Sequence, residues 1–237
     1  MLKIDLHIHS QYSGHAYGSF YDIVSEARRK KMKIIAITDH GPNMTGSATF
    51  MHFGMGYRAP QYKGLKILWG CEANILNVNG DIDLDSSLQK KLDILLIGLH
   101  GNSGYKNLEI MGNTKAVINA LKNPNVHVLT HPTNPQFEYD FDKIFQTALD
   151  NDVLLELNLS YLAKNMSDNR SLLLLKKMID MTKKAGKKLI VNSDAHFIEE
   201  IGDDSILNKY RTQLGLTNDM IINNYPDTLM KFLEKKK

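Results

Sequence analysis

Two histidines near the amino terminus, His7 and His9, are separated by one residue, and His15 follows soon after. The segment 3–9 alternates apolar and polar residues, which is the period of a β-strand with two different faces. Residues i and i+2 of a strand point the same way, so His7 and His9 can bind one cation together, as neutral imidazole does. The stretch therefore predicts the start of a metal site. The opposite, buried face is expected to carry Ile4, Leu6 and Ile8.

Further histidines and carboxylates stand after the other predicted strands. The candidate metal ligands are His7, His9, His15, His40, Glu72, His100, His131, Asp194 and His196. So many polar groups buried without partners would be costly, which argues against a purely structural role. His127 begins its strand, too far from the strand's end to share the site, and is expected to be structural. Histidine and carboxylate ligands without thiolate suit zinc, manganese or iron, and this number of ligands suits two or three ions.

The elements that must position these residues alternate between strands and helices. Strands are expected at 3–9, 33–38, 65–68, 93–99, 126–130, 153–157 and 188–191, and helices at about 20–31, 114–121, 140–149 and 169–184, with further helices covering the outside over 204–237. This alternation predicts a parallel sheet with crossover helices. An open sheet has its site at one switch point, whereas a closed barrel gathers all its carboxyl ends around one mouth. Convergence of the candidate ligands therefore favours a seven-stranded (βα) barrel with the metal site at the C-terminal ends of the strands.

Composition narrows the class of protein. The length of 237 residues suits one α/β barrel, so residues 1–237 are expected to form a single domain. One cysteine, Cys71, excludes an internal disulfide and favours a reducing, cytoplasmic setting. We expect neither a signal peptide nor a membrane span, because the amino terminus is charged and no apolar run approaches about 18 residues. The net charge of +3 comes with basic clusters at predicted helix ends, so no nucleic-acid partner is expected. A homo-oligomer stays open.

The motifs resemble those of the PHP (polymerase and histidinol phosphatase) superfamily. The resemblance rests on His7-x-His9, His15, Thr38-Asp39-His40, Gly70-x-Glu72, His100, His131-Pro132 and Ser193-Asp194-x-His196. Three segments further resemble the small stand-alone phosphatase branch of that superfamily, namely Asp39-His40-Gly41-Pro42, Glu72-Ala73-Asn74-Ile75 and His131-Pro132-x-Asn134-Pro135. The resemblance implies a distorted (βα)7 TIM-like barrel with a trinuclear metal site. It also implies a phosphatase that hydrolyses small phosphate monoesters.

By the same analogy, three divalent ions, zinc or manganese with iron as an option, are expected in the site. His7, His9, Glu72 and Asp194 would hold the first ion, Glu72, His100 and His131 the second, and His15, His40 and His196 the third. Hydroxide bound by the first two ions would attack phosphorus in line, and the third would bind the non-bridging oxygens.

The sequence offers a few further candidates for contact with the small phosphorylated substrate. Asp39 is a candidate general acid. His52 and Arg58 lie in the long stretch 41–64, which has the length of a lid or binding loop, and Asn158 follows a predicted strand. These three residues are candidate substrate-binding residues.

Other activities share most of these features. A histidinol-phosphate phosphatase, or a phosphodiesterase or nuclease of the same superfamily, would use the same ligands. An amidohydrolase barrel also begins with His-x-His, although His15, His40 and the Asp194-x-His196 pair are extra for a binuclear site. A metal-binding protein without catalytic activity would keep the same barrel.

Overall fold

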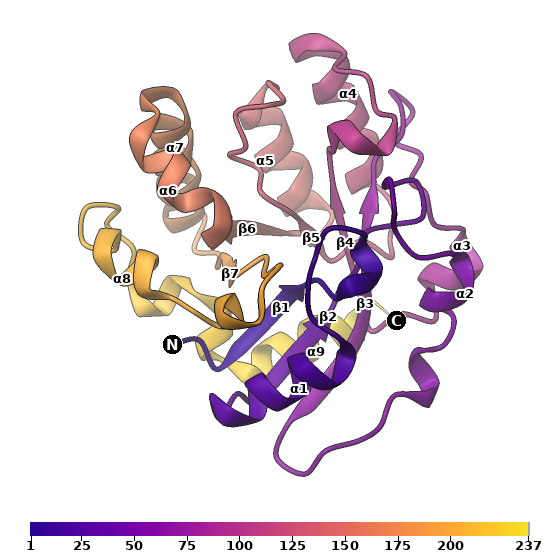
Figure 1. Ribbon diagram of the computed structural model, residues 1–237. Helices are drawn as coiled ribbons and strands as arrows, with labels where there is room; N and C mark the ends of the chain where they lie inside the picture. Colours follow the sequence, from indigo (N-terminus) through magenta and orange to yellow (C-terminus); the bar gives the residue numbers. More distant parts are fainter. Residues whose placement is uncertain (237) are drawn as a thin grey trace.

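The computed structural model describes residues 1–236 and contains seven parallel strands with helices between them (Figure 1). The strands are β1 (Ile4–Ile8), β2 (Ile34–Ile37), β3 (Lys66–Asn74), β4 (Ile94–Gly98), β5 (Val128–Leu129), β6 (Leu154–Asn158) and β7 (Ile190–Asn192). Each strand pairs in parallel with the next one along the chain. The (βα)7 barrel expected from the sequence is confirmed, and the open sheet is not.

The helices lie around the strands. They are α1 (Phe20–Arg29), α2 (Phe50–Phe53), α3 (Ser86–Gln89), α4 (Glu109–Leu121), α5 (Phe141–Asp150), α6 (Leu159–Ser167), α7 (Asn169–Lys184), α8 (Ser205–Tyr210) and α9 (Pro226–Lys235). Short 3-10 turns are η1 (Gln11–Ser13), η2 (Gly56–Arg58), η3 (Gly101–Ser103), η4 (Ile198–Glu200), η5 (Asn218–Met220) and η6 (Ile222–Asn224). Within residues 1–236, none of the helices combines the length and the apolar character needed to cross a membrane.

Helix starts follow local side-chain chemistry. The Ser19 hydroxyl accepts a hydrogen bond from the Asp22 amide, and the Asp22 carboxylate accepts one from the Ser19 amide at 2.9 Å, so a capping box begins α1. α7 has the bounds that the sequence predicted. α6 was not predicted, because it follows β6 without any loop. The Asn158 side chain ends that strand and caps the first turn of α6 by accepting from the Tyr161 amide.

A layer of aliphatic side chains fills the barrel interior near the amino ends of the strands. It contains Ile4, Leu6, Ile34, Ala36, Leu68, Ile94, Leu96, Val128 and Ile190. These residues alternate along the strands with others that face the surrounding helices. Leu229 and Leu233 of α9 belong to the same buried cluster, and α9 lies beneath β1 and β2 in Figure 1. The last helix therefore seals the amino end of the barrel, whereas the sequence had suggested that it covers the outside.

The alternation of β1 breaks before the strand ends. Ile4 and Leu6 point into the interior cluster, but Ile8 packs with Ile23 and Val24 of α1 on the other side. The pairing of β1 with β2 is irregular between Asp5 and Ile8, which permits this change of face. The prediction of one continuous apolar face on β1 is therefore wrong.

β3 is longer than the sequence predicted and is shared between two halves of the sheet. Its first part, 66–69, pairs with β2, and its second part, 70–74, pairs with β4. At the changeover, a Cβ on Gly70 would lie 2.7 Å from side-chain atoms of both Ile94 and Thr38, so only glycine fits there. Glu72 consequently lies inside β3 rather than after its end, and it forms an isolated bridge with His40.

The seam between β1 and β7 is held largely by side chains. The backbones meet in an isolated parallel bridge between Ile8 and Ala195. Nearer the amino end of the barrel, the Asn223 amide donates to the carbonyls of Ile4 at 3.0 Å and Val191 at 2.6 Å. Its carbonyl accepts from the Val191 amide at 2.9 Å. One buried side chain of η6 thus joins the first strand to the last.

We expect Asn223→Ala to lower the free energy of unfolding by about 2–3 kcal/mol, because it leaves buried backbone groups at the seam without partners. Urea denaturation followed by circular dichroism measures the change. Asn224→Ala is the matched control, since Asn224 is exposed and bonds only within its own turn region, to Asn218. Equal stability of the two variants would contradict the role of Asn223 in closing the barrel.

Candidate metal centre

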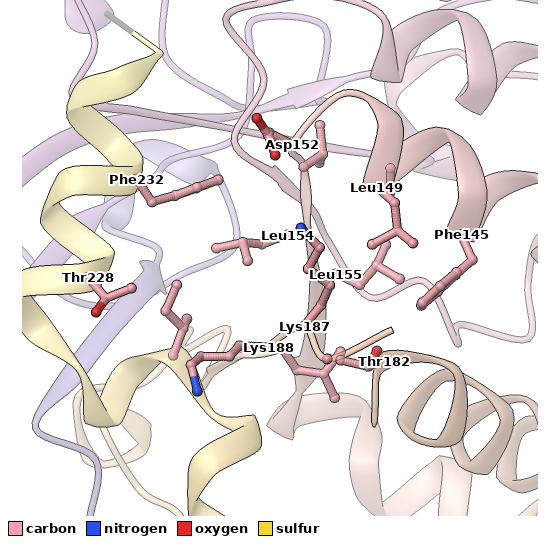
Figure 2. Close-up of a pocket in the computed structure, with 15 residues that line it drawn as sticks. Phe145, Leu149, Asp152, Leu154, Leu155, Thr182, Lys187, Lys188, Thr228 and Phe232 are labelled. Atoms are coloured by element: carbon pink, nitrogen blue, oxygen red, sulfur yellow. The ribbon is translucent and has the colours of Figure 1, made fainter. Parts of the chain in front are cut away.

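The carboxyl ends of the strands surround a polar cavity of about 220 Å³. It is lined by His15, His40, Met44, Glu72, Leu99, His100, Gly101, Asn102, His131, Asn134, Gln136, Ser160, Tyr161, Lys164, Asp194 and His196. Another cavity, of about 260 Å³, lies at the starts of β6 and β7 between Phe145 of α5 and Phe232 of α9 (Figure 2). Its lining is mainly apolar and contains no histidine. The candidate chemistry therefore belongs to the first cavity.

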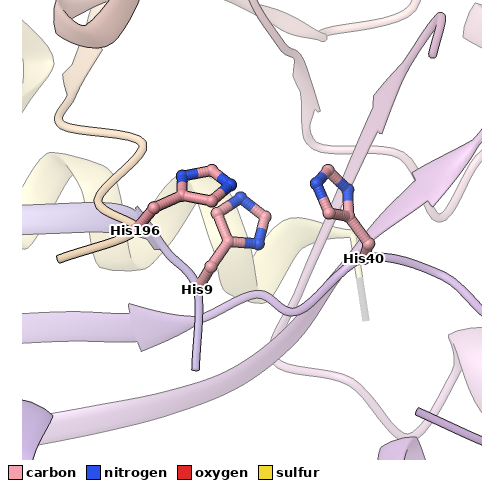
Figure 3. Close-up of side chains that lie close together, drawn as sticks. All are labelled: His9, His40 and His196. Atoms are coloured by element: carbon pink, nitrogen blue, oxygen red, sulfur yellow. The ribbon is translucent and has the colours of Figure 1, made fainter. Parts of the chain in front are cut away.

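The structure brings the nine predicted ligands together. Three sets of side chains each offer ligand atoms within 4.8 Å of one another: His9, His40 and His196; His7, His9 and Asp194; and His40, Glu72 and His100. Figure 3 shows the first set, in which His9 follows β1, His40 follows β2 and His196 follows β7, and whose rings gather around one space. His131 Nε2 lies 3.0 Å from Glu72 Oε1, and the ring of His15 stacks 4.7 Å from that of His196.

Glu72 is the central carboxylate. Its Oε1 lies 3.2 Å from His100 Nε2 and 3.0 Å from His131 Nε2. Its Oε2 lies 3.2 Å from His7 Nε2 and 2.9 Å from His40 Nδ1. Each oxygen of Glu72 therefore faces its own pair of histidines.

The outer ring nitrogens of two histidines are held by oxygen acceptors. His7 Nδ1 lies 2.8 Å from Glu156 Oε1, and His100 Nδ1 lies 2.8 Å from Asn74 Oδ1. A carboxylate or amide oxygen can only accept a hydrogen bond, so each Nδ1 carries the proton. In the neutral imidazole, each Nε2 is then left with a bare lone pair.

A similar arrangement fixes His9. Its Nδ1 lies 2.9 Å from Ser13 Oγ, and the Ser13 hydroxyl donates to Asp39 Oδ1 at 2.7 Å. Because the serine proton is used for Asp39, its oxygen accepts the proton of His9 Nδ1. His9 Nε2 therefore also presents a lone pair to the site.

The inner ring nitrogens of four histidines face one another in two pairs. His7 Nε2 lies 3.0 Å from His9 Nε2, and His100 Nε2 lies 3.1 Å from His131 Nε2. His40 Nδ1 is buried and makes no hydrogen bond within residues 1–236, despite its short distance to Glu72. Where neither nitrogen of such a pair carries a proton, the two lone pairs repel unless a cation lies between them. The residues present therefore fit divalent cations bound by imidazole and carboxylate.

The pKa values of the histidines show the same need for positive charge. Burial opposes the protonation of His7, but the carboxylates of Glu72, Glu156 and Asp194 outweigh it and raise the pKa of His7 well above its usual value. Burial lowers the pKa of His40 to about 3, and the charge of His9 adds to the effect. Burial also opposes the protonation of His131, but the hydrogen bond and charge of Glu72 outweigh it and raise the pKa of His131. Burial lowers the pKa values of His9 and His15 as it does that of His40, which favours the neutral form that binds metal.

Two candidate ligands have unusual backbone conformations. His131 has φ of 32° and Asp194 has φ of 56°, in the left-handed region that non-glycine residues seldom adopt. Hydrogen bonds hold both: the His131 amide donates to Glu156 Oε2 at 2.9 Å, and Asn158 Nδ2 donates to Asp194 Oδ2 at 3.1 Å. The left-handed backbone conformation thus directs the side chains of His131 and Asp194 toward the cavity.

The other predicted site residues lie away from the cavity wall. Asp39 is buried and accepts hydrogen bonds from Ser13, from both the amide and the hydroxyl of Ser10, and from His52 at 3.0 Å. Asn158 is buried behind Asp194, and Arg58 is exposed at the end of η2. The structure therefore places the candidate general acid and all three candidate substrate-binding residues outside the cavity lining.

Sequence reasoning missed the residues that orient the ligands, namely Glu156, Asn74 and Ser13. Glu156 carried a usable signal, because it is the one charged residue in the predicted strand 153–157 and is fully buried. A carboxylate in such a run needs a partner. No local pattern of residues indicates that the partner is His7, which lies 149 positions away.

The fold and the site define a class of protein, the metal-binding barrel with histidine and carboxylate ligands at its mouth. The sequence pattern of the PHP domain matches residues 5–218, and the chain belongs to the PHP domain family. A probable phosphatase of Thermoanaerobacter sp. (strain X514) is 35% identical over 239 residues, covering 100% of this chain and 96% of that protein. A probable phosphatase of Clostridium botulinum (strain Hall) is 34% identical, covering 98% of this chain and 95% of that protein.

Solved structures support the fold. The histidinol phosphate phosphatase of Lactococcus lactis, in complex with zinc, L-histidinol and phosphate, has a TM-score of 0.65 at 18% identity, covering 90% of this chain and 94% of that one. A chain of an archaeal ribonuclease P with mature tRNA has a TM-score of 0.62 at 15% identity, covering 98% and 90%. At these identities, the likeness is one of fold alone.

We expect Glu156→Gln to weaken metal binding by about 10–100-fold, since residues that orient ligands commonly contribute this much. The glutamate accepts from four donors, those of His7, Asn192, His131 and Asn158, and an amide cannot accept from all of them. Competition with a chelating dye measures the affinity, and circular dichroism shows whether the variant is folded. Glu138→Gln, at an exposed ion pair with Arg170, is the control. A folded Glu156→Gln variant with unchanged affinity would rule out this orienting role.

Proposed function

We propose that the chain is a metal-dependent phosphatase that hydrolyses small phosphate monoesters with three divalent ions at the mouth of the barrel. The observation that carries the proposal is the convergence of imidazole nitrogens around Glu72. Relatives named probable phosphatases, aligned over nearly the whole chain, support the reaction class.

The proposed ligands are those expected from the sequence. His7, His9, Glu72 and Asp194 would hold the first ion, Glu72, His100 and His131 the second, and His15, His40 and His196 the third. Zinc or manganese, with iron as the other option, suits imidazole and carboxylate. The zinc in the Lactococcus lactis enzyme supports zinc. Because proposed ligands come from both ends of the chain, we treat residues 1–237 as one catalytic domain. The one cysteine, Cys71, is buried, and we propose a cytoplasmic setting.

Divalent ions bound there would lower the pKa of water and offset the charge on the phosphoryl oxygens. The chain supplies the geometry for this chemistry. Glu156, Asn74 and Ser13 keep each proton on the outer ring nitrogen, so that the inner nitrogens stay available. Asp39 acts on His9 through Ser13, and we propose that it is a positioning residue rather than the general acid.

Hydrolysis of an aryl phosphate monoester, compared with the matching diester, tests this function. We expect monoester turnover by protein loaded with manganese or zinc, and its loss when a chelator removes the metal. A preference for the diester would favour the phosphodiesterase or nuclease activity of the same superfamily. If neither ester is cleaved by metal-loaded protein, the phosphatase proposal fails, and an amidohydrolase or a metal-binding protein without catalysis becomes the better interpretation.

The bridging role of Glu72 predicts unequal losses of metal. We expect Glu72→Ala to lose about two ions per chain and His131→Ala about one, because a bridge serves two ions and a terminal ligand serves one. Inductively coupled plasma mass spectrometry of the purified variants counts the bound metal. Equal losses would count against the bridge.

A further inference from the structure

Part of the polar cavity is lined by side chains that the metal centre does not use. Four polar side chains line it without a hydrogen-bond partner among residues 1–236: Asn102, Gln136, Ser160 and Lys164. A fifth, Asn134, accepts a hydrogen bond from the Gln136 amide at 3.0 Å and keeps its own amide hydrogens free. They come from η3, from the loop after β5 and from α6. All four unpaired side chains are exposed, so they can exchange hydrogen bonds to water for hydrogen bonds to a ligand in the cavity.

Lys164 is the only lysine or arginine among the lining residues. Its Nζ lies 5.2 Å above the ring of Tyr161, and that ring lies 5.3 Å from the ring of His131. Tyr161 thus connects the lysine to a proposed metal ligand. Since no carboxylate within residues 1–236 pairs with Lys164, its charge is available to a ligand beside the metal centre.

The carboxylates that line the cavity contact the candidate metal ligands. Glu72 and Asp194 are the only carboxylates in the lining, and both contact histidines. Apart from Tyr161, large apolar side chains in the lining are Met44 and Leu99. The part of the substrate beyond the phosphate therefore meets amides, a hydroxyl and one ammonium group. This environment suits a hydrophilic leaving group and disfavours a lipid.

We propose that the substrates carry a second anionic group, a carboxylate or a second phosphate, on the leaving group, and that Lys164 binds it. This inference rests on the proposed phosphatase function. The amides of Asn102, Asn134 and Gln136 and the hydroxyl of Ser160 would bind hydroxyls of the same leaving group. A leaving group that bears an ammonium, as in L-histidinol phosphate, would be repelled by Lys164.

A matched set of phosphate monoesters tests the proposal. Glycerol 3-phosphate has a neutral leaving group, 3-phosphoglycerate replaces its end with a carboxylate, and glycerol 1,3-bisphosphate adds a second phosphate. We expect at least one anionic compound to have a KM about tenfold lower than glycerol 3-phosphate, as a charge-assisted hydrogen bond allows. L-histidinol phosphate should be the poorest substrate. Which anionic compound is preferred tells a carboxylate substrate from a bisphosphate.

Variants of Lys164 separate recognition from general damage. Lys164→Met should bring the KM of the anionic compound to within about twofold of that for glycerol 3-phosphate, and Lys164→Arg should restore the difference. Lys164→Glu should reverse the order and favour L-histidinol phosphate. Lys184→Met, at the exposed end of α7, is the control and should behave as the unmodified protein.

The outcomes distinguish the two proposals. If wild-type protein hydrolyses all these esters with equal KM, or if Lys164→Met changes every KM by the same factor, the anion preference is refuted while the phosphatase function stands. If no ester is cleaved, including an aryl phosphate, the phosphatase function itself fails. A lowered KM for the anionic compound that disappears only in Lys164→Met and Lys164→Glu supports the inference.

Discussion

The half of this barrel near the carboxyl ends of the strands depends on holding imidazole nitrogens close together, facing inward. His7 and His9 approach to 3.0 Å, and His100 and His131 to 3.1 Å. Such a group is unfavourable in isolation, since buried polar atoms need partners. The protein satisfies the outer nitrogens itself, through oxygen atoms such as those of Glu156. A bound cation would satisfy the inner nitrogens, so metal binding and local structure would be coupled at this end of the barrel.

The half of the barrel near the amino ends of the strands supplies the rigidity that the close-packed histidines need. Aliphatic side chains fill the interior, and Leu229 and Leu233 of α9 seal it. The strands are thereby fixed at their amino ends, so their carboxyl ends keep the ligands in place. Two irregular features of the sheet also help to position the ligands. β3 changes its pairing partner from β2 to β4, which carries Glu72 to the centre of the site. Asn223 closes the seam between β1 and β7, where few backbone hydrogen bonds form.

The end of β6 differs from the other strand ends. It carries none of the predicted ligands, but it provides Glu156, which orients His7, and Asn158, which holds Asp194 and caps α6. α6 then carries Tyr161 and Lys164 to the cavity. β6 thus provides residues that support the candidate metal ligands, and α6 provides part of the surface that would face the rest of the substrate.

The sequence by itself determined the fold class and singled out nine candidate ligands, which the structure places around one cavity. Each ligand is a residue type that binds metal, near the end of an apolar run, and only a closed barrel brings such ends together. The turn of Ile8 toward α1, the extension of β3 through Glu72 and the existence of α6 required the structure. So did the positions of Asp39 and Asn158, which face the ligands rather than the cavity. The physical reason is that these features depend on contacts between residues far apart in the chain. The hydrogen bond from His7 to Glu156 spans 149 positions, and a local pattern of residues cannot indicate so distant a partner.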